Sequence, residues 1–176
     1  MKIACVLTNF FEDSEFKDPY DAYKQAGHEV TIIGNQAGEE IEGKKHNVKT
    51  KVDKSIDEVT PEQFDALFIP GGYSPDQLRA NPKFVEFTKS FFKNDKPVLA
   101  ICHGPQLMIS AGVTGGRKMT AWKTIQVDLG FTGANVVDEP VVVDGNLVTS
   151  RQPSDIPAFI EESKKLLEKV PAGARA

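Results

Sequence analysis

The sequence is poor in the residues that build disulfide scaffolds and metal centres. It contains two cysteines and three histidines in 176 residues. Two cysteines are too few for a disulfide framework, and no pair among these five residues has the spacing of zinc ligands. We therefore expect neither a disulfide scaffold nor a metal site, and nothing in the sequence points to a cofactor.

Long apolar runs and a strong net charge are also missing. The formal net charge is −4, so no basic excess favours nucleic acid or an anionic membrane as a partner. No apolar run is long enough to cross a bilayer. The first residues, MKIACVLTNFFED, meet polar and acidic residues after a short apolar run, unlike a signal peptide. We expect a cytoplasmic protein with no nucleic-acid or membrane partner.

Short apolar segments alternate with amphipathic ones along the chain. The apolar segments predict strands at residues 2–8, 28–34, 64–72 and 97–102, with two more across a hairpin turn in residues 135–150. The amphipathic segments predict helices at residues 14–27, 74–95, 104–112 and 153–170. Residues 36–59 are polar and rich in glycine, and predict an exposed β-ribbon outside the core.

This alternation predicts an α/β fold, with a mostly parallel sheet covered by helices on both faces. We expect a single domain over residues 1–170 and a flexible C-terminal tail over residues 171–176. Sites in such folds lie beyond the carboxyl ends of the strands, where three segments with polar or glycine residues end predicted strands.

The most informative of these segments surrounds Cys102. The pattern from Ala100 to Gly104 is A-x-C-x-G, in which small residues two positions before and after a nucleophile allow a tight strand-to-helix turn. The helix N-terminus would favour a thiolate, and His103 could add positive charge or act as a general base. We predict an exposed Cys102 of low pKa. Cys5 lies in the middle of an apolar strand and is expected to be a buried core residue.

Two further segments end neighbouring strands. The N–H groups of Gly71 and Gly72, with that of His103, could form an oxyanion hole, or the glycines could simply make a tight turn. After the first strand, a protonated acid could donate a hydrogen bond to the sulfur. The candidates are Glu12 and Asp13, of which Asp13 is also a natural N-cap for a helix beginning at the next residue; the residues alone do not choose between them.

Four blocks together carry a family resemblance: NFFEDSEF, DALFIPGGYSPDQLR, AICHGPQLMISAG and VVVDGNLVTSRQPSDIPAF. In this order and spacing they resemble the ThiJ/PfpI family over residues 2–168, nearest to its PfpI-like intracellular protease and general stress protein branch. The resemblance implies a flavodoxin-like three-layer sandwich, related to the class I glutamine amidotransferases.

The resemblance also implies roles for individual residues. It makes Cys102 the nucleophile, His103 its adjacent histidine, and Glu12 rather than Asp13 the acid that hydrogen-bonds the thiol. It makes Gly72, and less directly Gly71, the donors of the oxyanion hole.

Two more residues are assigned in the same way. In the PfpI branch an acidic residue from a neighbouring subunit orients the histidine, and its position corresponds to Asp76. Trp122 stands where an aromatic residue lines the pocket, whereas His46 lies in an altered block, GKKHN instead of GKHG, and is not carried over. A site completed by a second subunit implies a homo-oligomer, either a dimer or the hexamer of some PfpI members.

The expected function is that of a cysteine-dependent hydrolase of stress defence, in which the Cys102 thiolate attacks carbonyl substrates. One version cleaves peptide bonds; another converts methylglyoxal or its early adducts on protein, which is glyoxalase or deglycase chemistry. The chain has no long insertion to build peptide subsites, which favours small carbonyl compounds. Two alternatives stay open: a redox-sensing or chaperone-like stress protein with an oxidisable cysteine, and a scaffold that only binds partners.

Overall fold

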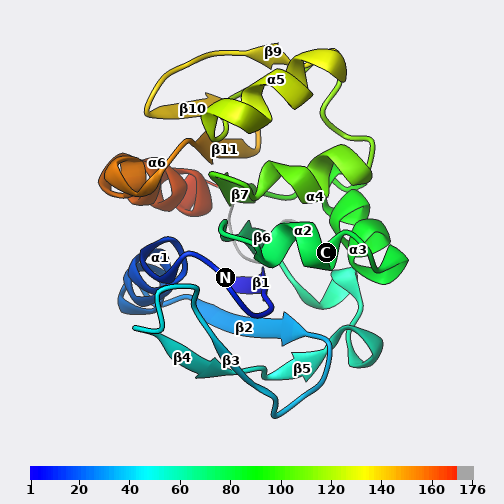
Figure 1. Cartoon of the computed structure of the whole chain (residues 1–176), viewed down its shortest axis with the longest axis vertical. Coiled ribbons are helices and arrows are strands. Elements are labelled where there is room, and N and C mark those ends of the chain that lie inside the picture. Colours follow the sequence, from blue (N-terminus) through cyan, green and yellow to red (C-terminus); the bar gives the residue numbers. More distant parts are fainter. Residues whose placement is uncertain (170–176) are drawn as a thin grey trace.

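One central sheet organises the computed structural model, which describes residues 1–169 (Figure 1). Its strands within these residues are β1 (Lys2–Val6), β2 (Glu29–Gly34), β5 (Lys54–Ser55), β6 (Ala66–Ile69), β7 (Val98–Ile101), β10 (Val141–Asp144) and β11 (Leu147–Ser150). Their order across the sheet is β10-β11-β7-β6-β1-β2-β5. All neighbours pair in parallel except β10, which runs antiparallel to β11 across the predicted hairpin turn.

Helices cover both faces of this sheet. On one face lie α1 (Asp13–Gln25) and α6 (Ile156–Lys169), and on the other α2 (Ser74–Leu78), α3 (Pro82–Lys93), α4 (Pro105–Ser110) and α5 (Lys123–Phe131) (Figure 1). Alternate residues of β1 serve the two faces: Ile3 and Cys5 pack in the cluster of α1 and α6, and Ala4 packs in the opposite cluster. This architecture confirms the predicted flavodoxin-like three-layer sandwich.

Residues 36–59 form the predicted ribbon, but the prediction that it lies outside the core is wrong. The strands β3 (Glu40–Glu42) and β4 (Lys49–Lys51) pair antiparallel, and β5 then joins the edge of the main sheet. Ile41 and Val52 are buried in the cluster that also holds α1. Their apolar side chains alternate with charged neighbours, so the ribbon has one buried face.

The remaining elements are short. A second two-stranded sheet joins β8 (Lys118–Met119) to β9 (Asn135–Val136), and the 3₁₀ helices are η1 (Ile56–Glu58), η2 (Pro61–Gln63) and η3 (Pro153–Asp155). The predicted tail over residues 171–176 lies outside the described residues. Within residues 1–169, every helix is too short or too polar to span a membrane.

Two phenylalanines test the packing of the helical layer. Phe91 in α3 is fully buried and its ring lies 5.2 Å from that of Phe87, whereas Phe131 at the end of α5 is 88% exposed. Phe91→Ala should lower the free energy of unfolding by about 3–5 kcal/mol because it leaves a cavity. Phe131→Ala should change it by less than about 0.5 kcal/mol. Urea denaturation measures both, and equal losses would contradict this packing.

Candidate active site

The predicted nucleophile elbow is present between β7 and α4. Cys102 has a φ of 61°, a left-handed conformation that is unusual for a residue other than glycine. A Cβ atom at Gly104 would lie 2.5 Å from the carbonyl oxygen of Ile69, so only glycine fits there. The turn places the sulfur at the carboxyl edge of the sheet, where the thiol is half-buried.

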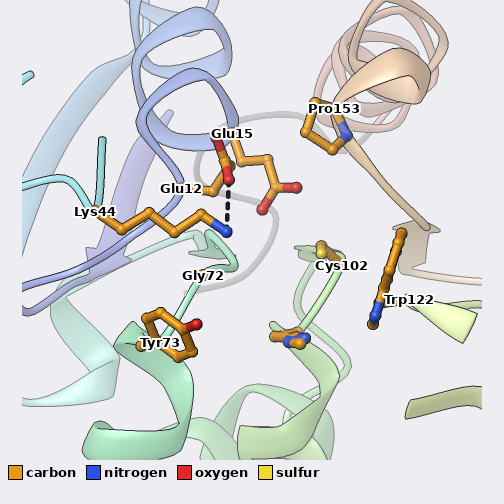
Figure 2. A pocket seen from close by; sticks show the side chains of 9 residues that line it. Glu12, Glu15, Lys44, Gly72, Tyr73, Cys102, Trp122 and Pro153 are labelled. Carbon is orange, nitrogen blue, oxygen red and sulfur yellow. Dashed lines mark ion pairs between the residues drawn. The ribbon is translucent and has the colours of Figure 1, made fainter. Parts of the chain in front are cut away.

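The sulfur lies in a pocket of about 280 Å³ (Figure 2). The residues that line it are Glu12, Glu15, Lys44, Gly72, Tyr73, Cys102, His103, Trp122 and Pro153. Five of these were predicted as site residues from the sequence, whereas Gly71 and Asp76 are not part of the lining. Sequence reasoning missed the other four, which are Glu15, Lys44, Tyr73 and Pro153.

The acid at the sulfur is Glu15, and the assignment of this role to Glu12 is wrong. The Glu15 carboxyl group lies beside Cys102 in the pocket: a Cβ atom at Gly71 would lie 2.3 Å from an oxygen of Glu15 and 2.9 Å from the Cβ of Cys102. The two carboxylate oxygens of Glu12 instead lie 2.9 Å from the ammonium groups of Lys44 and Lys45. The reason is where α1 begins: Glu12 occupies its N-cap position, and Glu15 falls one turn later on the buried face of the helix.

Burial and mutual repulsion set the protonation of this pair. Burial, with the nearby charge of Glu12, raises the pKa of Glu15 to about 8. Burial also raises the pKa of Cys102, and the nearby charge of Glu15 raises it further. The N–H of His103 and the charge of Lys44 oppose this rise without reversing it. The prediction of a low thiol pKa is therefore wrong. It considered the N-terminus of the helix, which lowers the thiol pKa, but not burial and a neighbouring acid, which raise it.

A carboxyl group with a pKa near 8 is mostly protonated at neutral pH. Cys102 and Glu15 then titrate as one unit rather than as two independent groups, because ionisation of either one disfavours ionisation of the other. The form that has lost one proton can hold the negative charge on the sulfur while Glu15 keeps its proton.

His103 follows the nucleophile directly, and its ring centroid lies 6.5 Å from that of Trp122. Burial lowers the pKa of His103, helped by the charge of Lys44, so the imidazole is neutral at pH 7 and can accept a proton. Asp76 acts on it only at a distance, since its exposed carboxylate is bound by Arg79 at 2.8 Å. The described residues show no hydrogen bond between Asp76 and His103, and a role of Asp76 across a subunit interface stays a prediction.

The two glycines after β6 differ in what they offer. Gly71 does not line the pocket, and a Cβ atom there would lie 2.3 Å from an oxygen of Glu15, so this glycine makes room for the acid and its role as an oxyanion donor stays a prediction. Gly72 has a φ of 78°, and a Cβ atom there would lie 2.3 Å from the backbone nitrogen of Glu12. Gly72 and Phe11 form an isolated antiparallel β-bridge. Its two hydrogen bonds run from the N–H of Glu12 to the carbonyl of Gly71 and from the N–H of Tyr73 to the carbonyl of Phe10, so neither uses the N–H of Gly72. An oxyanion role therefore fits Gly72 better than Gly71.

Lys44 reaches the pocket because residues 43–48 fold back over the start of α1. Asp13 is not the N-cap that the sequence suggests; it is the first residue of α1, and its carboxylate accepts hydrogen bonds from the backbone N–H groups of Lys45, Asn47 and Val48 at 2.9–3.0 Å. Burial opposes ionisation, but these bonds lower the pKa of Asp13. His46 of the same loop is exposed and pairs with Glu42 away from the sulfur.

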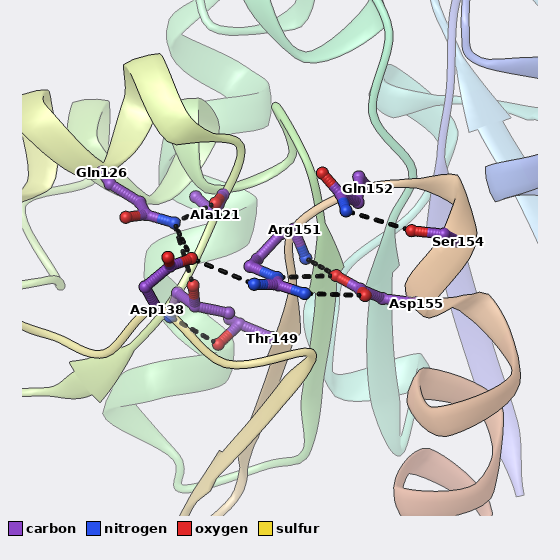
Figure 3. Close-up of polar contacts among 9 residues, drawn as sticks. Ala121, Gln126, Asp138, Thr149, Arg151, Gln152, Ser154 and Asp155 are labelled. Carbon is purple, nitrogen blue, oxygen red and sulfur yellow. Dashed lines mark hydrogen bonds and ion pairs between the residues drawn. The ribbon is translucent and has the colours of Figure 1, made fainter.

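A polar network supports the opposite wall of the pocket (Figure 3). Arg151, at the end of β11, binds both carboxylate oxygens of Asp155 at 3.0 and 3.1 Å and reaches Asp138 at 3.1 Å. Gln126 of α5 donates to the same Asp138 oxygen, and its backbone N–H donates to the carbonyl of Trp122. The network therefore fixes η3, which carries Pro153, relative to the backbone of Trp122.

Other candidates from the sequence lie apart from this pocket. Cys5 is fully buried in β1, as predicted, and both cysteines are free. His28 contacts the N-terminal amine through Nδ1 at 3.1 Å. Among residues 1–169, no group of three or more His, Cys, Asp or Glu side chains is arranged to hold a metal ion.

The three-layer fold and the cysteine elbow define a class of α/β proteins with a nucleophile at the sheet edge. Residues 1–166 match the DJ-1/PfpI family, and the chain belongs to this family. It is 56% identical to General stress protein 18 of Bacillus subtilis, over 96% of this chain and 98% of that protein. It is also 56% identical to Protein/nucleic acid deglycase 2 of Escherichia coli (94% and 97%) and 49% identical to the Putative cysteine protease YraA of B. subtilis (95% and 98%).

Solved structures share this fold. A two-domain protein from Anabaena variabilis, with DJ-1/ThiJ/PfpI-like and ferritin-like domains, superimposes with a TM-score of 0.92 at 38% identity, over 95% of this chain and 48% of that one. DJ-1 from Schizosaccharomyces pombe shares the fold with a TM-score of 0.84 at 23% identity, over 99% of this chain and 94% of that one.

Two glycine substitutions test the elbow. Gly104→Ala should lower the free energy of unfolding by about 1–3 kcal/mol, since the new methyl group overlaps the backbone of β6. Gly130→Ala is the matched control: this helical glycine has open space around it, so alanine should stabilise the protein by about 0.5–1 kcal/mol. Thermal and urea denaturation measure both changes. A neutral Gly104→Ala would contradict the crowded turn.

The coupling of Cys102 to Glu15 is testable through the rate of alkylation by iodoacetamide as a function of pH. Glu15→Gln removes the carboxylate charge that opposes ionisation of the thiol, so the midpoint of the profile should move to lower pH by about one unit or more. Glu12→Gln, whose carboxylate binds two lysines instead of the sulfur, should move it less. An unchanged or higher midpoint in Glu15→Gln would refute the coupling.

Proposed function

We propose that this protein is a cysteine-dependent stress-defence enzyme of the cytoplasm that acts on small carbonyl compounds, methylglyoxal and its early adducts on protein among them. The observation that carries the proposal is the half-buried Cys102 thiol beside an acid whose pKa is about 8. An acid with a pKa this close to neutrality can both give and take a proton during one catalytic cycle. The names of the stress protein and the deglycase among its relatives support the same assignment.

The first step uses the form of the pair in which the sulfur is ionised and Glu15 is protonated. Attack of Sγ on the aldehyde carbon forms a C–S bond and moves the carbonyl π electrons onto oxygen. The proton of Glu15 passes to this oxygen, which gives a hemithioacetal. The backbone N–H groups of Gly72 and His103 are the candidates to stabilise the charge while it develops on the oxygen.

The later steps need a base and then water. For methylglyoxal, the proton on the former aldehyde carbon moves to the neighbouring carbon through an enediol, and the ketone is reduced to a hydroxyl group as the hemithioacetal becomes a thioester. The carboxylate of Glu15 and the neutral imidazole of His103 are the available proton carriers. Water then cleaves the thioester to lactate and restores the thiol, so the net reaction consumes one water and no other reactant.

The size of the pocket favours small carbonyl compounds over peptides. Its volume of about 280 Å³ is at the lower limit for sites that hold a drug-sized ligand, whereas a peptide needs an extended cleft. Peptide hydrolysis through the same thiol is the second candidate, supported by the relative named as a putative cysteine protease.

A redox role is a third candidate, and one contact favours it. The Glu15 carboxyl group beside the sulfur could hydrogen-bond a sulfinic acid if peroxide oxidised Cys102. The raised pKa of the thiol weighs against rapid oxidation, because the thiolate is the species that peroxide attacks.

We also propose a homo-oligomer, with a dimer as its basic unit, in which Asp76 of one subunit orients His103 of another. Two features of the surface support this. The Asp76 side chain is 58% exposed, and two large aromatic side chains near it are also exposed, Phe10 by 48% and Tyr73 by 62%. The backbones of Tyr73 and Phe10 are joined by a hydrogen bond and Tyr73 lines the pocket, so exposed aromatic surface lies beside the site.

A substrate panel tests the function. Wild type and Cys102→Ser are assayed with methylglyoxal, glyoxal, glycated peptides and unmodified peptides. We expect turnover of methylglyoxal or glycated peptide by wild type and none by Cys102→Ser. The serine hydroxyl is much less acidic than the cysteine thiol, so it does not supply an ionised nucleophile. Asp76→Ala should lower kcat if the subunit interface completes the site. Full activity in Cys102→Ser would refute the proposal, and rapid oxidation of Cys102 without any turnover would favour the redox role.

A further inference from the structure

Lys44 brings a cationic side chain into the pocket from the ribbon that the sequence placed outside the core. Its ammonium group extends toward the centre of the pocket, on the side opposite Trp122 (Figure 2). The loop that carries it is held by the three backbone hydrogen bonds to Asp13. This position is therefore built by the fold and does not depend on a flexible surface side chain.

The charges around this ammonium group do not cancel. Glu12 is nearly buried, and its single negative charge is shared by Lys44 and Lys45, each 2.9 Å from one of its oxygens. Glu15 has a pKa of about 8 and is mostly neutral at pH 7, and the lowered pKa of His103 makes its ring neutral. Asp76 at the rim is neutralised by Arg79. Glu12, Lys44 and Lys45 therefore carry one net positive charge between them, and Lys44 is the cation of this group that lines the pocket.

Lys44 is close enough to influence the reacting groups. Its positive charge contributes to the pKa of Cys102, of Glu15 and of His103. Burial alone would lower the pKa of Lys44 itself, but the ion pair with Glu12 raises it above the ordinary value. Lys44 therefore stays an ammonium ion, which excludes it as an amine nucleophile and leaves it an electrostatic role.

The ammonium group also has donors to spare. A lysine ammonium has three N–H groups. One N–H group is directed to Glu12. The ring of Tyr73, whose centroid lies 5.6 Å from the ammonium nitrogen, makes a cation–π contact that does not use a hydrogen bond. An anionic group on a bound molecule can therefore contact Lys44 while the ion pair with Glu12 persists.

We propose that Lys44 is a specificity-determining residue that makes the pocket prefer small carbonyl compounds with a carboxylate next to the carbonyl group. The proposal rests on the carbonyl chemistry of Cys102 proposed above and names the substrate class for it. The carboxylate would lie against Lys44 and direct the adjacent carbonyl carbon toward the sulfur. Neutral dicarbonyl compounds would enter the same pocket without this contact.

The test uses two alkylating reagents of nearly the same shape, iodoacetate and iodoacetamide, one anionic and one neutral. Both react with the thiolate, so a change in the pKa of Cys102 affects both rates equally and cancels in their ratio. We expect Lys44→Met, which keeps the aliphatic stem and removes the charge, to lower the iodoacetate/iodoacetamide rate ratio about tenfold at low ionic strength. Peptide mass spectrometry identifies which cysteine is alkylated. Cys5 is fully buried and should stay unmodified.

Two matched variants accompany this measurement. Lys44→Arg keeps a positive charge and should retain the ratio within about threefold of wild type. Lys45→Met removes the other lysine bound to Glu12, which does not line the pocket, and should also stay within about threefold. A ratio that does not change in Lys44→Met, or that falls equally in Lys45→Met, would overturn the proposal.

A second readout uses the carbonyl compounds themselves. Glyoxylate, an aldehyde with an adjacent carboxylate, should protect Cys102 of wild type from iodoacetamide at lower concentration than glyoxal does, and Lys44→Met should abolish this difference. Equal protection by the two compounds in wild type would contradict the preference for an anion. Failure of the carbonyl chemistry is distinguishable, because then neither compound protects Cys102 while the ratio of the two alkylation rates still reports the charge of Lys44.

Discussion

The contact between the Cys102 thiol and the Glu15 carboxyl group is the constraint on which the rest of the site depends. It joins the tips of two strands far apart in the sequence, β1 through the start of α1 and β7 through the elbow. An acid next to a nucleophilic sulfur is useful only if the two groups share their protons, and burial produces this condition by raising the pKa of both. The other groups of the pocket then act on a pair that already holds a transferable proton.

The fold accepts local strain to make this contact. Cys102 adopts a positive φ, and the crowded positions at Gly71, Gly72 and Gly104 have no room for a side chain. At Gly71, a Cβ atom would lie 2.3 Å from an oxygen of Glu15 and 2.9 Å from the Cβ of Cys102. The absence of a side chain at this position is what lets the acid reach the sulfur, and this is a structural role for Gly71 that the sequence did not predict.

The fold and the elbow could be predicted from the sequence because local rules determine both. Alternating apolar and amphipathic segments give the layers, and the small residues around Cys102 give the turn. The choice of acid could not be made in this way, since Glu12 and Glu15 lie within one helical turn and only the first residue of α1 decides which of them faces the sulfur. A usable signal was the buried stripe of α1, in which Glu15 precedes Phe16, Pro19 and Tyr23. Lys44 carried no such signal, because its position depends on hydrogen bonds to Asp13 from residues 32 to 35 positions further along the chain.

The most direct test of the shared proton is a pH titration by NMR, with ¹³C labels on the side-chain carboxyl group of glutamate and on the Cβ of cysteine. The account predicts that the Glu15 carboxyl signal stays in its protonated position through pH 7 and moves near pH 8, and that the Cys102 thiol ionises only at higher pH, because the carboxylate formed near pH 8 opposes loss of a second proton. A Glu15 carboxyl group that titrates near its ordinary value of 4.5 would contradict it.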